Sequence, residues 1–107
     1  MDSRLHNAVG LAMKAGKCIS GDFAVEQALR ASKVKLVLLD EDASENTRDR
    51  YERLCRRMNA DLKTMTTLGD AIGKPSRMIA AVTDENMTKL ILSAFAQQDR
   101  NGGRSDG

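Results

Sequence analysis

Residues 35–40 read Lys-Leu-Val-Leu-Leu-Asp and form the clearest predicted strand of the chain. The four large aliphatic side chains at positions 36–39 follow one another without a polar interruption. A strand with apolar residues at every position is typical of a strand that is covered on both faces. Residues 78–82, Met-Ile-Ala-Ala-Val, show the same pattern. We therefore expect two buried strands, each far shorter than the roughly 20 residues that a bilayer span requires.

Helical segments separate these strands. Apolar side chains recur three and four residues apart in them, which predicts one buried face for each helix. The helices are expected at residues 3–15, 21–31, 44–58, 68–72 and 84–97. Ser44 and Asp84 are expected to be N-caps. Residues 17–20 are expected to form a short strand or an extended link, and a weak strand is expected at residues 63–66. Helices that alternate with short buried strands predict an α/β fold, a three-layer α/β/α sandwich around a mixed sheet of about four short strands.

The size and composition of the chain fit one globular domain. It has 107 residues, of which 41% are hydrophobic, and we expect the domain to cover residues 1–98. A polar, glycine-rich tail at residues 99–107 is expected to be disordered. The first residues carry no apolar stretch of the kind found in signal peptides, and two isolated cysteines suit a reducing compartment. The expected protein is cytoplasmic and monomeric and makes no contact with a membrane.

Side chains that could support catalysis are scarce. His6 is the one histidine of the chain, and it falls on the first predicted helix, where a surface or half-buried role is the expected one. Cys18 and Cys55 lack the spacing of a metal site, and Cys55 falls on the apolar stripe of its helix. The acidic run at residues 40–42 is interpreted as structural, because no phosphate-binding loop accompanies it. We therefore expect no enzyme activity, no metal and no cofactor.

The charge of the chain is a weak guide to its partner. It carries 17 basic and 15 acidic residues, a net charge of +2, which many proteins without a polyanionic partner share. Five arginines lie on the third predicted helix: Arg48, Arg50, Arg53, Arg56 and Arg57. We interpret them as a solvated face with local ion pairs to Asp49 and Glu52.

Three blocks of sequence resemble a known family. They are residues 10–21, which run from Gly-Leu-Ala through Gly-Lys to Ser-Gly; residues 35–47, KLVLLDEDASENT; and residues 68–84, LGDAIGKPSRMIAAVTD. Together they resemble the bacterial YlxQ-like group of the ribosomal protein L-seven-Ae/L-thirty-e superfamily, over about residues 4–96. The resemblance implies an α/β/α sandwich that binds kink-turn RNA. It also implies a ribosome- or RNA-associated accessory protein without catalytic activity, whose partners include structured RNA and ribosomal, translation or transcription proteins.

The resemblance also implies where RNA is bound. The first family element reads Gly-x-Asn-Glu-x-x-Lys at the start of the second helix, and its polar groups contact sheared G·A pairs. Gly21 matches the glycine, whereas Phe23, Ala24 and Gln27 replace the asparagine, glutamate and lysine, and Asp22 would repel phosphate. The second element is the loop at residues 72–78, which the resemblance places beside residues 41–43.

In this loop, Lys74 and Arg77 offer phosphate contacts, while Ile72, Pro75 and Met78 offer an apolar seat for an unstacked base. Without the resemblance, the loop reads as a solvated turn with two ordinary surface cations. The candidate RNA-binding residues are Lys17, Gly21, Asp22, Phe23, Gln27, Ile72, Lys74, Pro75, Ser76, Arg77 and Met78.

Two alternatives stay open at this point. Phe23 either stacks on a base or fastens the second helix to the core, and the second role is the commoner one for a lone aromatic at a helix start. The whole domain either binds RNA or serves as a protein-interaction module on the same fold, and the loss of the Asn, Glu and Lys positions favours the second reading.

Overall fold

The computed structural model describes residues 3–104, with side chains placed for residues 4–98. Its elements, in chain order, are α1 (Ser3–Lys14), β1 (Cys18–Ser20), α2 (Asp22–Arg30), β2 (Leu36–Asp40), α3 (Glu45–Met58), β3 (Asp61–Met65), α4 (Leu68–Ile72), β4 (Ile79–Val82) and α5 (Glu85–Arg104). The two strands predicted to be buried are β2 and β4, and every residue of both is buried.

The four strands form one mixed sheet in the order β1-β4-β2-β3. Strand β4 is antiparallel to both of its neighbours, β1 and β2. Strands β2 and β3 are parallel, and Leu36 pairs with Asp61 at the start of both. The mixed sheet of four short strands that the sequence predicts is therefore confirmed.

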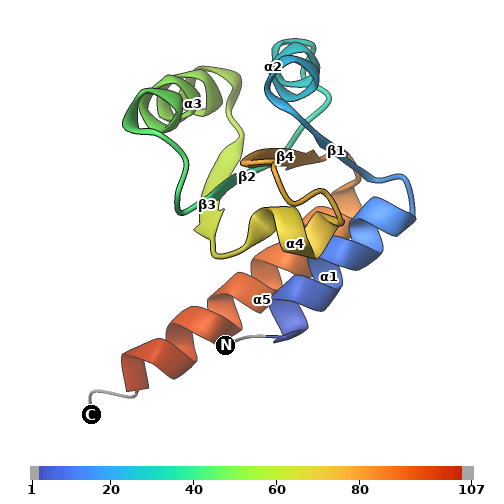
Figure 1. Cartoon of the computed structure of the whole chain (residues 1–107), viewed down its shortest axis with the longest axis vertical. Helices are drawn as coiled ribbons and strands as arrows, with labels where there is room; N and C mark the ends of the chain where they lie inside the picture. Colours follow the sequence, from blue (N-terminus) through green and yellow to red (C-terminus); the bar gives the residue numbers. More distant parts are fainter. Residues whose placement is uncertain (1–2, 105–107) are drawn as a thin grey trace.

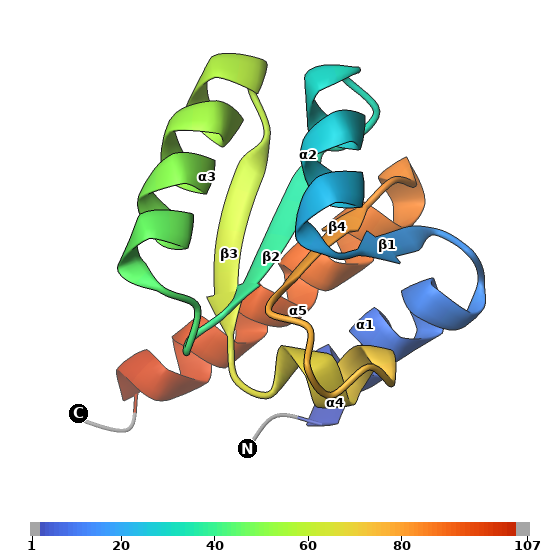
Figure 2. The same ribbon diagram turned by 45° about the horizontal axis from the view of Figure 1, so that its top comes forward.

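Helices cover both faces of this sheet. Successive residues of β2 point to opposite faces, so Leu36 and Leu38 enter a core with α1, α4 and α5. Val37 and Leu39 enter a second core with α2 and α3. Figures 1 and 2 show the two groups of helices on opposite sides of the strands. The α/β/α sandwich is confirmed, and the unbroken apolar run of β2 is explained by the two cores that it serves.

Two elements extend beyond their predicted bounds. Strand β3 begins at Asp61, two residues before the expected start, because pairing with β2 holds it extended over its whole length. Helix α5 continues to Arg104, so residues 99–104 are helical and not the disordered tail that the composition predicts. Extending a formed helix avoids the cost of nucleation, which composition alone does not reveal. Residues 105–107 of that tail lie outside the described residues. Neither α5 nor any other described helix is long and apolar enough to cross a membrane.

Side-chain oxygens cap several helices. Ser44 Oγ accepts a hydrogen bond from Thr47 N at 3.1 Å, as predicted. Asp84 Oδ2 accepts one from Met87 N at 2.9 Å, also as predicted. Asp40, at the end of β2, is buried, and its Oδ2 accepts from Leu68 N at the start of α4 at 2.8 Å. The structural interpretation of the acidic run is therefore confirmed for Asp40, whose carboxylate joins β2 to α4.

Candidate nucleic-acid interface

The start of α2 and the loop after α4 meet at Gly21. The backbone of Gly21 has a φ of 101°, a conformation that favours glycine. A Cβ atom at this position would collide with the guanidinium group of Arg77. The backbone conformation therefore favours glycine here, and the missing side chain leaves room for the guanidinium group of Arg77 to lie over the backbone. The contact brings together the two segments that the resemblance assigns to RNA, which are neighbours in Figure 2.

The first turn of α2 carries no side-chain cap. Gly21 N donates a hydrogen bond to Ile79 O at 3.1 Å, which ties the start of the helix to β4 and uses this N–H group. The N–H groups that follow, of Asp22, Phe23 and Ala24, are the first-turn donors that a helix leaves without an intrahelical acceptor. They also mark the positive end of the helix dipole. This end of α2 is therefore suited to an anionic group.

The loop between α4 and β4 is folded tightly against α4. Lys74 N donates to Gly69 O at 2.8 Å, and Arg77 N donates to Lys74 O at 2.9 Å. A Cβ atom at Gly69 would lie 2.7 Å from the carbonyl oxygens of Lys74 and Pro75. Because real Cβ atoms do not approach an oxygen so closely, only glycine at position 69 lets the loop adopt this path.

We expect Gly69→Ala to destabilise the domain by about 1–3 kcal/mol, because the added methyl group forces the backbone of the loop outward. Thermal unfolding followed by circular dichroism measures the change. Asp70→Ala, at the exposed neighbouring position of the same helix, is the control and should stay within about 0.5 kcal/mol of the wild type. Equal stability of both variants would show that the loop can move without cost.

Most of the predicted loop residues lie on the surface. Lys74, Pro75, Ser76 and Arg77 are exposed, and Met78 is 40% exposed. Neither cation takes part in an ion pair among the described residues. The loop therefore presents two unpaired positive charges beside apolar surface.

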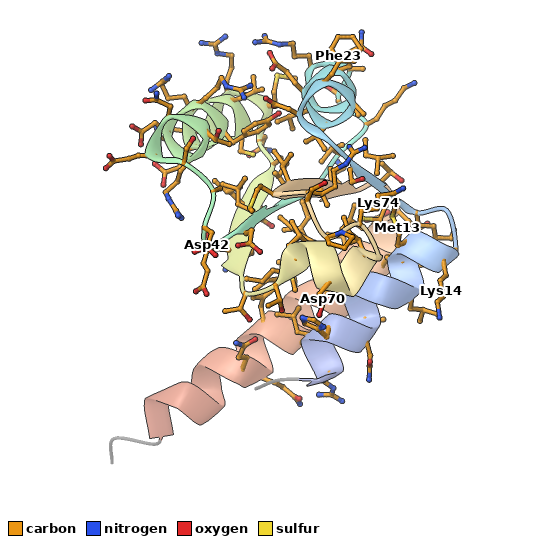
Figure 3. All side chains as sticks on the ribbon, in the orientation of Figure 1. Met13, Lys14, Phe23, Asp42, Asp70 and Lys74 are labelled. Carbon is orange, nitrogen blue, oxygen red and sulfur yellow. The ribbon has the colours of Figure 1, made fainter. Side chains whose placement is uncertain are left out.

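A surface hollow lies next to the loop. Pro75 and Met78 line it together with Glu41 and Asp42, which agrees with the neighbourhood that the resemblance implies. Its other lining residues are Asp40, Thr67, Gly69 and Asp70. Figure 3 labels Asp42, Asp70 and Lys74 around this part of the molecule.

Two predicted site residues lie elsewhere. Ile72 is only 5% exposed and packs in the core with α1 and α5. Its assignment as part of an apolar seat was wrong, because the helical face of α4 turns it inward. Lys17 Nζ lies 3.2 Å from Asp84 Oδ1 at the start of α5. Since Lys17 precedes β1 and Gly21 follows it, the strand separates Lys17 from the contact between Gly21 and Arg77.

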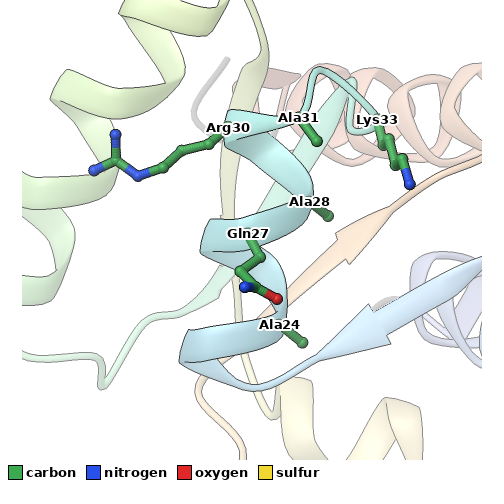
Figure 4. Close-up of a pocket in the computed structure, with 6 residues that line it drawn as sticks. All are labelled: Ala24, Gln27, Ala28, Arg30, Ala31 and Lys33. Carbon is green, nitrogen blue, oxygen red and sulfur yellow. The ribbon is translucent and has the colours of Figure 1, made fainter.

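Phe23 stands on the outer side of α2 and is 75% exposed. The interpretation that it fastens the helix to the core was wrong, and Figure 3 shows its ring pointing away from the body of the protein. Gln27 is also exposed and lies on the outer face of α2 in Figure 4. The hollow along this face is lined by Ala24, Gln27, Ala28, Arg30, Ala31 and Lys33. Three alanines and three long polar or charged side chains therefore line this face of α2.

Arg50 departs from the predicted solvated face of α3. It forms ion pairs with Asp22 at 2.7 Å and with Glu26 at 2.7 Å, both on α2. The predicted local pairs to Asp49 and Glu52 do not occur among the described residues, because α2 lies within reach of the arginine and offers two carboxylates. Sequence reasoning missed this contact, since no pattern within α3 indicates which helix lies beside it.

Neither cysteine of the chain is suited to nucleophilic chemistry. Burial raises the pKa of the Cys18 thiol to about 11. The pKa of the Cys55 thiol is also raised to about 11, mainly by burial and to a smaller extent by the negative charge of Asp61. Both thiols are thus far from the thiolate form that a nucleophile needs. His6 Nε2 lies 2.6 Å from Thr67 Oγ1. No group of three His, Cys, Asp or Glu side chains among the described residues could hold a metal ion.

Comparison with known proteins places the chain in a known family whose fold it shares. The model of the ribosomal protein L7Ae/L30e/S12e/Gadd45 family matches residues 3–93, and the chain belongs to this family. Within it, the chain is similar to two bacterial proteins named RNA-binding protein YlxQ. The protein of Bacillus subtilis is 38% identical over 88 residues, which cover 79% of this chain and 88% of the relative. The protein of Enterococcus faecium is 34% identical over 90 residues, covering 78% and 82%.

Solved structures show the same architecture. A protein of unknown function from Bacillus halodurans C superposes with a TM-score of 0.80 at 26% identity, covering 85% of this chain and 95% of that one. The 15.5kD RNA binding protein of Giardia lamblia superposes with a TM-score of 0.71 at 14% identity, covering 89% and 84%. At this low identity the second likeness supports the fold alone.

Proposed function

We propose that this protein binds structured RNA without catalysing a reaction, and that the RNA is a kink-turn or a ribosomal RNA element of similar shape. The contact of Arg77 with Gly21 carries the proposal. It joins an uncapped helix start, which attracts anions, to a loop with two unpaired cations. The family and the names of the two bacterial relatives support the same conclusion.

The surface suits a bent RNA backbone beside an unpaired base. Lys74 and Arg77 are placed to meet phosphates, and the first turn of α2 offers N–H groups to another phosphate. Met78 and Pro75 offer apolar contact to a base that has left its stack, which is how proteins commonly recognise structured RNA. Gly21 lacks a side chain, so the guanidinium group of Arg77 can lie over the backbone at the start of α2 and meet a phosphate there.

A protein partner is the second candidate function. The outer face of α2 carries Phe23, Ala24 and Gln27 at the positions where the family element has hydrogen-bonding groups. An exposed aromatic ring beside small apolar side chains is typical of a surface that binds protein. The ability of wild-type protein to bind RNA distinguishes the two functions.

Direct binding to a kink-turn duplex tests the proposal. We expect the wild type to bind this RNA more tightly than a control duplex in which Watson–Crick pairs replace the G·A pairs. The triple variant Phe23→Asn, Ala24→Glu and Gln27→Lys should tighten binding at least about tenfold, because each group restores a hydrogen bond to the RNA. Fluorescence anisotropy measures both affinities.

The triple variant keeps the net charge of the wild type, since it adds one negative and one positive side chain. A gain in affinity therefore reflects specific contacts and not charge alone. If the wild type binds neither RNA, the protein-interaction function is favoured. If a folded triple variant binds no better than the wild type, the RNA approaches α2 in another geometry than in the family.

A further inference from the structure

Arg50 of α3 holds the first turn of α2 through two carboxylates. Its Nη2 lies 2.9 Å from Asp22 Oδ1 and 2.7 Å from Asp22 Oδ2. Its Nη1 donates to Glu26 Oε1 at 2.7 Å. Asp22 is the first residue of α2 and follows Gly21 directly. One arginine therefore links α3 to the end of α2 where the proposed RNA surface lies.

Tyr51 of α3 also contacts Asp22. Its side chain is fully buried, and its hydroxyl group lies 3.0 Å from Asp22 O and donates to Asp22 Oδ1 at 2.6 Å. The guanidinium carbon of Arg50 lies 4.7 Å from the centroid of the Tyr51 ring, a cation–π distance. The hydrogen bonds of Arg50 and then Tyr51 hold the pKa of Asp22 below its ordinary value. The carboxylate is thus kept charged, oriented towards α3 and matched by a positive charge.

A free carboxylate at this place would oppose the binding of RNA. Asp22 adjoins the helix start that is suited to phosphate, and two like charges at such short range repel each other. We propose that Arg50, supported by Tyr51, is a positioning residue of the RNA surface: it turns the carboxylate of Asp22 towards α3 and neutralises it, so that the first turn of α2 can receive phosphate. This inference rests on the proposed function.

Asp22 is the carboxylate whose environment depends most on Arg50. Glu26 also contacts Arg50, but it forms a second ion pair with Arg30 at 2.9 Å and keeps this partner when Arg50 is replaced. Asp22 has no second cation among the described residues. Removing Arg50 therefore exposes one unmatched negative charge at the start of α2.

A double-mutant cycle on the kink-turn duplex tests the inference. We expect Arg50→Gln to weaken binding about fivefold, because it releases the charge of Asp22. Asp22→Asn alone should bind at least as tightly as the wild type. The double variant should return to within about twofold of Asp22→Asn, although both variants that lack Arg50 lose the pair between α2 and α3. The temperature of thermal unfolding should therefore be lower in Arg50→Gln and in the double variant than in the wild type. The second substitution thus rescues the affinity for RNA but not the stability of the fold.

The control is Arg53→Gln, an exposed arginine of α3 without an ion pair among the described residues. It removes the same charge and should change affinity less than about twofold. The inference is overturned if Arg50→Gln behaves like this control, or if the double variant binds as weakly as Arg50→Gln, which would mean that Arg50 contacts RNA itself or only maintains the fold. Failure of the wild type to bind RNA would overturn the proposed function, and the inference with it. A wild type that binds, with no coupling in the cycle, overturns the inference alone.

Discussion

Replacement of Val37 with aspartate should unfold the domain. Val37 is fully buried in β2, where it enters the core with α2 and α3. The described residues that form the core around Val37 are apolar and offer it no cation, and an unpaired buried charge costs about 3–5 kcal/mol or more. Domains of this size have a free energy of unfolding of about 5–15 kcal/mol, so this cost, added to the lost burial of the valine side chain, removes a large share of the stability and all of it in a domain of marginal stability. Far-ultraviolet circular dichroism and chemical denaturation measure the effect.

Thr64→Asp is the matched control, because it places the same side chain at an exposed position of β3. It should cost no more than about 1 kcal/mol, the range of strand propensities. A Val37→Asp variant that melts like the wild type would contradict the placement of β2 between two layers of helices.

The double change Lys74→Ala and Arg77→Ala should weaken binding to the kink-turn duplex by about tenfold or more without lowering thermal stability. Both side chains are exposed and unpaired among the described residues, so the fold does not depend on them. Each phosphate contact releases counterions, and the slope of binding against salt should fall by roughly 1.5 units for the two cations. Affinities at several salt concentrations measure the slope.

Arg56→Ala with Arg57→Ala is the control for total charge, because these exposed arginines lie at the far end of α3. The control should keep most of the affinity and more of the salt slope than the loop variant. Equal losses in the two variants would assign binding to diffuse attraction or to α3. Such a result would leave the fold unaffected and would move the site away from the loop.

The sequence alone determined the architecture and the helix caps. The apolar runs of β2 and β4 are local patterns, and each has one simple explanation, a strand between two layers. Ser44 and Asp84 act on groups three residues away, so their role follows from nearby sequence. The resemblance of residues 10–21 to the family could also be seen in the sequence, because the backbone conformation at Gly21 favours glycine and so fixes the residue type there.

The tertiary structure decided which side chains face the candidate site. Ile72 is buried although it was expected at the site, and Phe23, for which two roles were open, is exposed. The direction of each helical face depends on where the helix rests on the sheet. Arg50 reaches a carboxylate 28 residues away, and Arg77 lies over a glycine from another part of the chain. These contacts arise between elements that the chain brings together only on folding. Local periodicity indicates which face of a helix is apolar. It does not indicate which charges and hydrogen-bond donors meet between helices, because those contacts join elements that are far apart in the sequence.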